Sequence, residues 1–492
     1  MKKLLIANRA EIAIRVARAA AELGTPTVAV APDDDASCLH TRQADGFVRL
    51  EGRGVRAYLD VAQLVSIAER EGCDAVHPGY GFLSESPTFA EACENAGLVF
   101  VGPSASQLEA LGDKLAARGR ARELAIPVLP GTDEPTGPGQ AKAMLEEHRD
   151  VRFMVKAVAG GGGRGLAVVA APSEVDAAFE RCAKEAQAYF GSPELYVERL
   201  VERARHLEVQ VLGDGTGAVV DLGERECTLQ RKHQKIVELA PSPGLAEGVR
   251  AAIVEAARRM AGSLDFRSLG TFEFLLDEDT DEVFFIEANP RLQVEHTVTE
   301  AVTGVDLVQA QLRIASGARL ADLGLGQRSE PNGHAIQLRI NTETLSDEGD
   351  ALPAGGVIES FTAPTGPGVR IDTHAYAGFA TSPHFDSLLT KVIVHTPGDH
   401  AAAVAKARRA LAELRVDGVA TNAPFLAALL GDEAIRENEI DTRYIARHAA
   451  RLNEMLGRSD AAGAASGLAG VRVDEGDPLA VLKHGVAQHT DE

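Results

Sequence analysis

Short apolar runs alternate with amphipathic stretches through the first hundred residues of the chain. The run "KLLIA" at 3–7 predicts a strand, and "EIAIRVARAAAELG" at 11–24 predicts a helix that a glycine ends. "PTVAVA" at 26–31 predicts a second strand, and helices predicted at 58–72 and 87–97 lead into the runs "DAVHPG" and "LVFVGP". Strands and helices that alternate at this pace indicate a parallel sheet with helices on its faces.

The pattern changes after the proline- and glycine-rich stretch "PGTDEPTGPGQ" at 130–140, which we interpret as a linker or hinge. From about residue 206 strand-like runs dominate, and a third region, about 333–446, begins with "GHAIQLRIN" and ends in helix-like sequence. The small residues of "DAAGAASGLAG" at 460–470 are typical of a flexible linker. A chain of 492 residues with this organisation suggests about three domains.

Composition and charge narrow the class of protein. Hydrophobic residues at 45% and charged residues at 25% are ordinary for a soluble globular enzyme. The net charge of −22 disfavours non-specific binding of nucleic acid, so an anion site requires a local basic cluster. The N-terminus has too few apolar residues for a signal peptide, and no apolar run reaches the length of a membrane span. The five cysteines include no C-x-x-C pair, so we expect a cytoplasmic protein without structural zinc.

A glycine run, "KAVAGGGGRGL" at 156–166, contains the spacing G-x-G-x-x-G at Gly160, Gly162 and Gly165. A dinucleotide-binding loop must pass directly into a helix, but the residues after this run are strand-like. The flanking runs instead predict a hairpin with a glycine-rich tip, whose backbone N–H groups can approach phosphate oxygens. Lys156 on the incoming strand could reach the same phosphates, although a mobile surface hairpin remains the alternative.

Two glutamates in the segment 270–296 are predicted to face each other. Apolar runs flank the acidic turn "DEDTD", and a loop at 278–282 places Glu273 directly across from Glu287 in an antiparallel pair. Like charges in that position repel, and Mg²⁺, which takes carboxylate oxygens together with substrate phosphates, resolves the conflict. Asn289 lies on the same face of the extended chain. A solvated face of the hairpin is the alternative interpretation.

Beyond this pair the sequence carries a mixed polar face and a basic cluster. Arg291, Gln293 and Glu295 recur at period two, which suggests a small-anion pocket with a general base. The segment "ERECTLQRKHQK" is either solvated surface or an anion site, and its basic residues are Arg225, Arg231, Lys232, His233 and Lys235. These features together indicate a magnesium- and ATP-dependent enzyme that acts on a small anion.

A series of motifs resembles biotin carboxylase. They are "IANRAEIAIR" (6–15), "HPGYGFLSES" (77–86), "GDK" (112–114), "KAVAGGGGRG" (156–165), "RHLEVQVLGD" (205–214), "ERECTLQRKHQKIVE" (224–238), "GTFEFL" (270–275), "FIEANPRLQVEHTVTEAVTGVDLV" (285–308), "LRIN" (338–341) and "DSLLTKVIV" (386–394). The resemblance covers about residues 3–446, and the stretch 285–308 is highly specific.

The resemblance implies a multidomain α/β and α+β fold of the ATP-grasp type. A Rossmann-like N-terminal α/β domain is expected over residues 1–112, and an ATP-grasp domain over 113–310 with a mobile glycine-rich lid at about 131–203. A biotin carboxylase C-terminal domain is expected over 330–447, followed by a linker and short tail over 448–492. The tail segment "VRVDEGDPLAVLKHG" is interpreted as a docking segment, with a disordered tail as the alternative.

The resemblance also implies a reaction, the first half-reaction of an acyl-CoA or pyruvate carboxylase. ATP, with Mg²⁺ or Mn²⁺, phosphorylates bicarbonate to carboxyphosphate, and the CO₂ that this releases carboxylates biotin. ATP contacts are implied for Lys114, Lys156, Gly161, Gly162, Gly163, Glu198, Leu200, His206, Gln230, His233 and Leu275, and metal contacts for Glu273, Glu287 and Asn289. The implied bicarbonate and biotin pocket consists of Lys235, Arg291, Gln293, Val294, Glu295 and Arg339. In it Glu295 is the implied base, Arg339 stabilises the biotin enolate, and Lys235 and Arg291 complete the catalytic set.

Several residues depart from the common pattern of the family. Ala10 replaces a glycine, Ala204 a frequent proline, and Gln337-Leu338 the usual Glu-Cys, while Glu238-Leu239 replaces an acidic pair. The substitution at Gln337 could alter how Arg339 is oriented.

No biotinylation sequence A-M-K-M occurs. We therefore expect biotin on a separate biotin carboxyl carrier protein, with separate carboxyltransferase subunits and a homodimer or larger complex. Neither nucleic acid nor membrane is an expected partner. The competing interpretations are another ATP-grasp ligase that joins a carboxylate to an amine, and a non-catalytic scaffold subunit.

Overall fold

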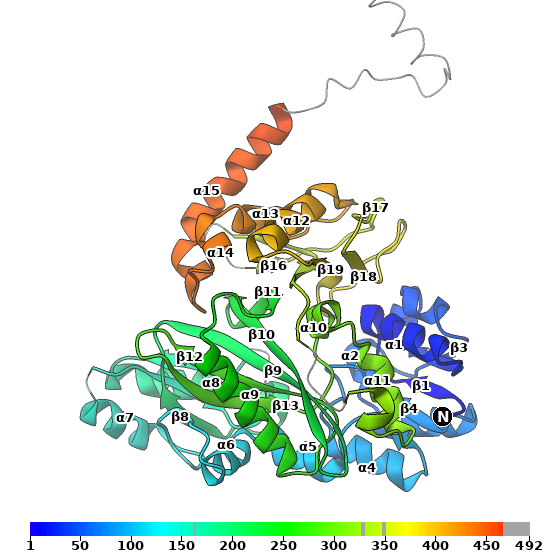
Figure 1. Ribbon diagram of the computed structural model, residues 1–492, viewed down its shortest axis with the longest axis horizontal. Helices are drawn as coiled ribbons and strands as arrows, with labels where there is room; N and C mark the ends of the chain where they lie inside the picture. The colour runs from blue at the N-terminus through cyan, green and yellow to red at the C-terminus, as the bar shows by residue number, and fades with distance from the viewer. Residues whose placement is uncertain (149, 161–163, 326–329, 347–350, 466–492) are drawn as a thin grey trace, which may run out of the picture.

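The computed structural model describes residues 1–148, 150–160, 164–325, 330–346 and 351–465. Figure 1 shows an N-terminal α/β unit beside a long antiparallel sheet, with a smaller lid unit at one end and a helix-covered C-terminal unit at the other. The tail segment expected to dock on a partner, and the implied ATP contacts Gly161, Gly162 and Gly163, lie outside the described residues.

The N-terminal unit is a parallel sheet, as the alternation of apolar runs predicts. Its strand order is β3-β2-β1-β4-β5, and every neighbouring pair is parallel. The strands are β1 (Leu4–Ile6), β2 (Thr27–Ala31), β3 (Gly46–Arg49), β4 (Ala75–His77) and β5 (Val99–Phe100). The helices are α1 (Ala10–Glu22), α2 (Gly54–Tyr58), α3 (Val61–Arg70) and α4 (Pro87–Asn95), followed by α5 (Ala105–Gly112) and α6 (Lys114–Glu123).

The lid unit has its own sheet and its own core. Strands β6 (Phe153–Ala157), β7 (Leu166–Val169) and β8 (Leu195–Arg199) form a three-stranded sheet, and helices α7 (Pro138–Glu147) and α8 (Val175–Phe190) contribute to the core beneath it. β6 and β7 pair antiparallel with Lys156 opposite Leu166, so the predicted hairpin around the glycine run is confirmed. Gly165 has a φ of 66°, a left-handed conformation that favours glycine. α7 begins inside the stretch expected to be a linker, at Pro138.

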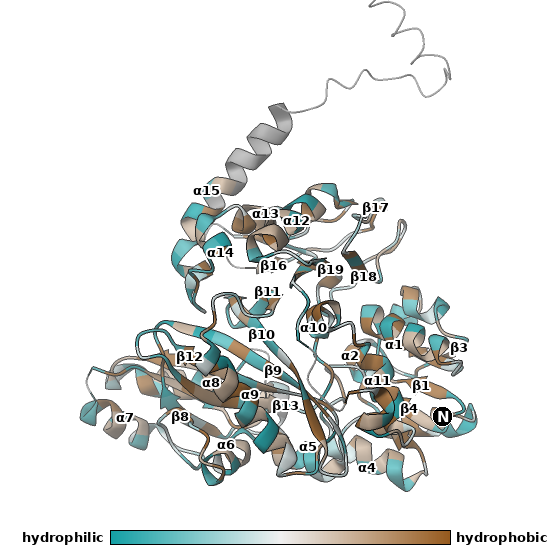
Figure 2. Ribbon diagram, viewed as in Figure 1, coloured by the Kyte–Doolittle hydropathy of each residue, from teal (hydrophilic) through white to brown (hydrophobic). Residues whose placement is uncertain are grey.

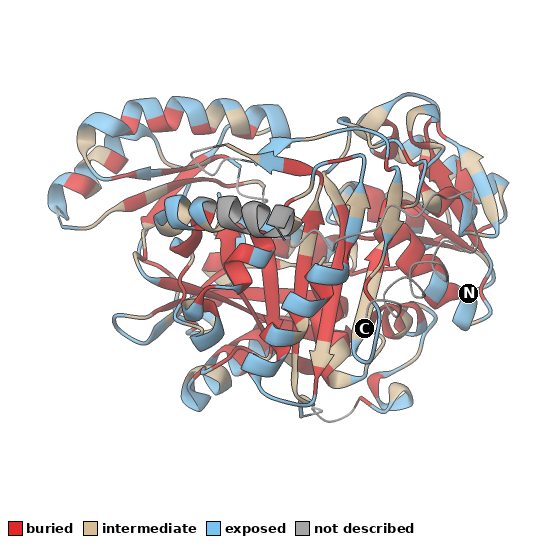
Figure 3. Ribbon diagram, turned by 90° about the horizontal axis from the view of Figure 1, so that it is seen from above, coloured by how far each residue is buried: buried red, intermediate tan, exposed pale blue. Residues whose placement is uncertain are grey.

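An eight-stranded antiparallel sheet is the largest in the described chain, with the order β13-β12-β9-β10-β11-β14-β19-β18. Its first half consists of β9 (Ala204–Asp214), β10 (Val219–Arg231), β11 (Gln234–Ala240), β12 (Arg267–Asp277) and β13 (Glu282–Asn289). Its second half consists of β14 (His334–Asn341), β18 (Val369–Thr373) and β19 (Leu388–Thr396). β11 pairs with β14, so the regions expected to be the ATP-grasp and C-terminal domains share one continuous sheet. Its strands are mostly buried (Figure 3).

Helices cover this sheet and connect its halves. They are α9 (Glu247–Gly262), α10 (His296–Thr303), α11 (Leu307–Ala315), α12 (His400–Glu413), α13 (Ala423–Leu430), α14 (Glu433–Glu437) and α15 (Tyr444–Ala465). Short strands β15 (Glu343–Leu345), β16 (Ala351–Pro353), β17 (Ser360–Thr362) and β20 (Arg415–Asp417) form two small ladders at the periphery. The helices carry both hydrophobic and hydrophilic segments (Figure 2), as expected when one face packs on a sheet.

Two sequence-based expectations change in the C-terminal unit. The small residues at 460–465 are helical and belong to α15, which projects away from the body in Figure 1, so the linker expected there is wrong for these residues. Alanine has the highest helix propensity of the common residues, so a run of small residues does not by itself end a helix. Leu239 and Leu338, two of the departures from the family pattern, are buried in the core beneath α12 and α13.

Within the described ranges, no helix combines the length and the apolar character that crossing a membrane requires.

Candidate active site

The β12–β13 hairpin places Glu273 directly opposite Glu287, so the predicted pairing is confirmed. The local geometry differs from the simplest expectation, because pairing already begins at Asp277 and Glu282 and the register shifts between Glu273 and Phe274. One strand therefore carries an extra residue at this point, which is a β-bulge. The bulge restores the register that a longer turn would have produced.

Each of the two facing carboxylates is held by a different set of cationic or polar groups. Nζ of Lys114 lies 2.8 Å from Oε2 of Glu287. Nε2 of His206 lies 2.6 Å from Oε2 of Glu273, and Nδ2 of Asn289 donates a hydrogen bond of 2.7 Å to its Oε1. Burial opposes ionisation here, but Lys235 and His206 lower the pKa of Glu273, and Lys114 lowers the pKa of Glu287. Both groups are therefore anionic at neutral pH.

Lys235 is the electrostatic centre of the site. Its Nζ lies 2.5 Å from Oε2 of Glu208, 2.8 Å from Oε1 of Glu295 and 3.1 Å from Oε1 of Glu273. Desolvation opposes its charge, but the surrounding anionic groups hold the pKa of Lys235 well above its ordinary value. Lys235 therefore carries a charged ammonium among three carboxylates.

Glu295 is held between two cations. It is only 1% exposed, and besides Lys235 it accepts a hydrogen bond of 3.1 Å from NH2 of Arg339. Burial would raise its pKa, yet the charges of Lys235, Arg339 and Arg225 hold the pKa of Glu295 well below its ordinary range. Lys235 and Arg339 thus frame the carboxylate from two strands, β11 and β14.

The stretch that carries Arg291, Gln293 and Glu295 is not extended. The expectation that these three side chains alternate along a strand and share one face is therefore wrong. Glu295, with φ −85° and ψ 7°, is the residue immediately before α10, and the segment turns into that helix. The turn still groups the side chains, because NH1 of Arg291 donates to Oε1 of Gln293 at 3.0 Å. Nε of Arg291 also lies 3.1 Å from a carboxylate oxygen of Glu85, in the N-terminal unit. The carbonyl of Val294 accepts a hydrogen bond of 3.0 Å from the buried Lys391.

The lid contributes a second charged group near the site. Nζ of Lys156 lies 2.8 Å from Oε1 of Glu198, and NH1 of the buried Arg118 donates to Oε2 of Glu198 at 2.9 Å. These contacts join β6 and β8 of the lid to α6. Leu200 follows β8 and is half-buried, with its backbone N–H bonded to the carbonyl of Arg152.

The remaining residues implied in the nucleotide site lie along β9, β10 and β12. Nδ1 of His206 accepts a hydrogen bond of 2.6 Å from Nε2 of Gln230, so Nε2–H of the same ring donates to Glu273. Leu275 lies opposite His206 in the β9–β12 ladder. His233, at the tip of the β10–β11 hairpin, has a φ of 63°, and desolvation and the charge of Lys156 lower its pKa.

The basic cluster divides into two groups of different character. Arg225 is buried and pairs with Glu208, while Arg231 pairs with Glu343 at 2.5 Å, so both have partners inside the fold. Lys235 contacts the carboxylates described above, and His233 lies near Lys156 and His206. Arg225 and Arg231 are therefore held within the fold, and Lys235 is the residue of this cluster that contacts the candidate site carboxylates.

The sequence motifs assigned no role in the site to three of its polar residues: Glu208, Arg118 and Glu238. A signal existed for the first, since His206, Glu208 and Gln210 alternate on one strand and all three are buried. Polar residues on the buried face of a strand indicate a functional or structural polar network. The contacts of Arg118 with Glu198 and of Arg339 with Glu238 join distant segments and leave no such pattern.

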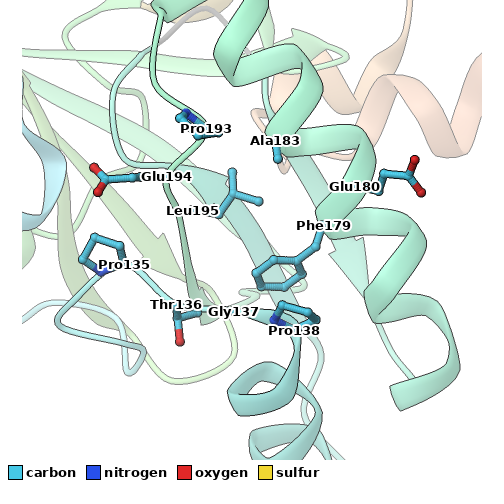
Figure 4. Close-up of a pocket in the computed structure, with 10 residues that line it drawn as sticks. All are labelled: Pro135, Thr136, Gly137, Pro138, Phe179, Glu180, Ala183, Pro193, Glu194 and Leu195. Carbon is cyan, nitrogen blue, oxygen red and sulfur yellow. The ribbon is translucent and has the colours of Figure 1, made fainter.

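A pocket in the lid lies away from this cluster (Figure 4). Phe179 and Ala183 of α8, Leu195 at the start of β8 and the prolines Pro135 and Pro138 line it. Glu180 and Glu194 are the acidic groups in its lining, and none of the paired catalytic candidates takes part. The candidate site residues described above lie instead in the buried charged network on the long sheet.

The donor set on the β12–β13 hairpin suits a hard divalent cation. Glu273, Glu287 and Asn289 supply oxygen ligands, which Mg²⁺ and Mn²⁺ prefer. Two carboxylates that directly face each other are electrostatically unfavourable without a cation between or beside them. The residues present therefore fit the metal that the sequence implies.

Models of three protein families match the chain. "Biotin carboxylase, N-terminal domain" matches residues 1–108, "Carbamoyl-phosphate synthase L chain, ATP binding domain" matches 113–323, and "Biotin carboxylase C-terminal domain" matches 337–447. Among solved structures, the biotin carboxylase domain of Hydrogenobacter thermophilus 2-oxoglutarate carboxylase, in complex with MgADP and bicarbonate, is 38% identical with a TM-score of 0.87, covering 92% of this chain and 98% of that one. The biotin carboxylase domain of a single-chain bacterial carboxylase is 44% identical with a TM-score of 0.82, covering 93% and 100%.

Curated relatives are longer proteins. Pyruvate carboxylase 1 of Caenorhabditis elegans is 47% identical over 451 residues, and human mitochondrial pyruvate carboxylase is 44% identical over 450 residues. The matches cover 91% and 90% of this chain but 38% of each relative, so the chain spans less than two-fifths of their length.

The chain belongs to the biotin carboxylase family, and it has the multidomain α/β fold of that family. It is a ligase of the biotin carboxylase type, which carboxylates biotin with ATP and uses Mg²⁺.

Proposed function

We propose that this chain transfers CO₂ from bicarbonate to biotin on a carrier protein, through carboxyphosphate, and that Glu295 is the base that starts the reaction. The observation that carries the proposal is the position of Glu295, buried between Lys235 and Arg339 and beside the Glu273–Glu287 pair. A base, two anion-binding cations and a cation site for nucleotide phosphates are then grouped in one network.

The lysines of this network would bind the nucleotide. Lys114 pairs with Glu287 and Lys156 pairs with Glu198, so each lysine and each carboxylate is already neutralised by a partner. The two lysines would then bind ATP phosphates. Glu273, Glu287 and Asn289 would bind a divalent cation. Mg²⁺ supplies charge neutralisation to the transferring phosphoryl group. Such an exchange of partners leaves few uncompensated charges in the buried site.

Bicarbonate would bind beside Lys235, Arg291 and Gln293. A bound anion competes for the positive charges that hold the pKa of Glu295 low, so its arrival raises the basicity of Glu295. Glu295 then accepts the bicarbonate proton, and the freed oxygen attacks the γ-phosphorus of ATP. ADP leaves, and the new P–O bond makes carboxyphosphate.

Biotin would receive the carboxyl group near Arg339. Carboxyphosphate breaks its C–O bond to give CO₂ and phosphate. The released phosphate would take the N1 proton of biotin, which places negative charge on the ureido oxygen, and a fixed guanidinium opposite that oxygen lowers the barrier. N1 would then form a bond to the carbon of CO₂. Arg339 is held in place by Glu238 and Glu295, at 2.5 Å and 3.1 Å.

The glycine-rich hairpin of β6 and β7 is proposed as part of a lid over the nucleotide. Closure would exclude water, which otherwise hydrolyses carboxyphosphate. Its link to the site in the structure is the Lys156–Glu198 pair, since Glu198 also holds Arg118 of α6.

A biotin carrier and a carboxyltransferase are the proposed partners, with a homodimer as the proposed assembly. The curated relatives that match are pyruvate carboxylases, and one similar structure, 39% identical, is of a single-chain long-chain acyl-CoA carboxylase. We propose pyruvate as the first carboxyl acceptor to test, with acyl-CoA thioesters as the alternative. All five cysteines are free thiols, which is compatible with a reducing, cytoplasmic location.

The function is tested by ATP hydrolysis measured with and without bicarbonate and with and without free biotin. The proposal predicts hydrolysis that requires bicarbonate and rises when biotin is added. ATP hydrolysis that does not require bicarbonate but requires an amine would favour the carboxylate–amine ligase. No hydrolysis under any condition would favour the scaffold.

A further inference from the structure

Glu238 and Gln337 are cross-strand partners in the β11–β14 ladder, and both are fully buried. Nε2 of Gln337 donates a hydrogen bond of 2.9 Å to Oε2 of Glu238. On its other side, the hydroxyl of Thr297 in α10 donates to Oε1 of Gln337. A carboxylate only accepts hydrogen bonds, so this arrangement turns the donor end of the amide toward Glu238 and matches an ionised Glu238.

The second oxygen of Glu238 leads to the proposed biotin site. Oε1 accepts a hydrogen bond of 2.5 Å from Nε of Arg339, and NH2 of Arg339 donates to Glu295 at 3.1 Å. Gln337 and Arg339 are two residues apart on β14, so their side chains share one face of the sheet. Hydrogen bonds therefore run without a break from Thr297 through Gln337, Glu238 and Arg339 to the proposed base.

We propose that Gln337 is a positioning residue for biotin carboxylation, which orients Glu238 and through it fixes the guanidinium of Arg339. This inference rests on the proposed function, because it concerns the step in which Arg339 stabilises the biotin enolate. Gln337 does not touch the reacting atoms in this account. Its contribution is to leave one oxygen of Glu238, and one only, directed at Arg339.

Gln337 replaces the acid that is usual in the family, and the charges that surround the position determine what an acid would do there. The ionisable groups that face Glu238 are Arg339 on β14, Glu295 before α10 and Cys227 on β10, while Lys391 of β19 lies opposite Arg339. Burial and Glu295 raise the pKa of Glu238, and Arg339 lowers it. A glutamate at position 337 would be the third carboxylate beside the guanidinium of Arg339. It would be accommodated there only by sharing a proton with Glu238.

The variant Gln337→Glu tests the positioning role through the pH dependence of biotin carboxylation. While protonated, the new acid donates to Glu238 and accepts from Thr297, as the amide does. As the pH rises through the pKa of the coupled pair, the proton leaves and two buried anions repel. We expect the rate of biotin carboxylation, relative to wild type at each pH, to fall about tenfold from the acidic to the alkaline end of the measured pH range. A ratio that stays constant over this range overturns the proposal.

Substitution Gln337→Met tests the same idea without adding charge. It removes the donor and keeps the volume, so biotin carboxylation should fall about tenfold at every pH. ATP hydrolysis that requires bicarbonate but not biotin should remain within about twofold of wild type, because Arg339 acts on biotin. An equal loss of both activities, or no loss of either, overturns the positioning role.

Gln311→Glu is the matched control for an acid placed at a buried amide. Gln311 lies on α11, where its amide contacts His77 and Ser268 and none of the charged groups around Arg339. This variant should keep the wild-type ratio of carboxybiotin formed to ATP hydrolysed at each pH. If biotin carboxylation by Gln311→Glu falls with pH as much as it does in Gln337→Glu, the proposal is overturned. Wild-type protein that fails to carboxylate biotin would instead refute the proposed function, which separates the two failures.

Discussion

Glu273 on β12 faces Glu287 on β13, and the two carboxylates are neutralised from different directions. Lys114 holds Glu287 from α6, whereas Lys235 on β11 and His206 on β9 hold Glu273. Two like charges fixed across a buried hairpin are maintained only if cations compensate them. This pair is therefore the proposed position at which a divalent cation and the nucleotide phosphates meet.

Substitution Glu287→Gln should raise the Mg²⁺ concentration needed for half-maximal activity by about tenfold or more, because an amide is a weaker ligand for a hard cation. A Mg²⁺ titration of bicarbonate-dependent ATP hydrolysis measures this effect. Glu282→Gln, an exposed change at the other end of β13, is the control and should leave the titration unchanged. The same Mg²⁺ requirement in Glu287→Gln and wild type would exclude Glu287 as a ligand.

Substitution Glu295→Gln should lower kcat for biotin carboxylation by about 10²- to 10⁴-fold, the usual contribution of a general base. The amide keeps the shape of the side chain, so the variant should still fold although it loses the ion pairs with Lys235 and Arg339. Steady-state rates at saturating ATP and bicarbonate provide the measurement. Full activity in this variant would remove Glu295 from the role of base.

The depressed pKa of Glu295 also predicts how stability depends on pH. Its folded pKa lies below the ordinary value of 4.5, so the unfolded chain binds the proton more readily. The stabilisation that Glu295 contributes is thus complete well above pH 4.5 and is lost as the pH falls through the folded pKa. Urea unfolding should show a free-energy difference between wild type and Glu295→Gln that is constant above about pH 5.5 and shrinks below about pH 4.5. A difference that grows on acidification would contradict the assigned direction.

Substitution Lys156→Met should raise the KM for ATP by about tenfold or more and leave the KM for bicarbonate within about twofold, since one charged contact to phosphate is removed. Lys142→Met is the matched control, because Lys142 is a lid lysine whose partner is the exposed Asp176. Initial rates at varied ATP separate the two variants. A larger effect on bicarbonate than on ATP would place Lys156 outside the nucleotide site.

Ala10 provides a prediction about stability. Its φ of 58° is left-handed, a conformation that costs a residue with a Cβ about 1–2 kcal/mol. Ala10→Gly should therefore leave the free energy of unfolding unchanged or raise it by up to about 1 kcal/mol, after the extra chain entropy of glycine is counted. Ala13→Gly, inside the same helix, should lower it by about 1 kcal/mol. Urea denaturation of both variants provides the comparison, and a larger loss for Ala10→Gly would contradict it.

Local patterns predicted the parts of the fold that depend on local order. The parallel N-terminal sheet, the hairpin around the glycine run and the pairing of Glu273 with Glu287 all follow from periodicity and short turns. The pairing was correct although the turn is shorter than expected, because the bulge beside Glu273 restores the register. A bulge has no distinct sequence signal here.

Contacts between distant segments could not be predicted in this way. Arg225 looked like part of an anion site, yet it is buried against Glu208 of the adjacent strand. Glu238 and Arg339 meet because β11 pairs with β14, although 101 positions separate them in sequence. Such pairings depend on sheet order, which periodicity does not encode, so only the resemblance to a known family pointed to Arg339.

Transfer of ¹⁸O from labelled bicarbonate to inorganic phosphate shows whether the reaction passes through carboxyphosphate. If bicarbonate oxygen attacks the γ-phosphorus and the C–O bond of carboxyphosphate then breaks, that oxygen stays on phosphorus. Each phosphate formed in biotin-dependent turnover in unlabelled water should therefore carry one ¹⁸O atom. Phosphate without label would mean that water attacks ATP, and it would contradict a reaction through carboxyphosphate.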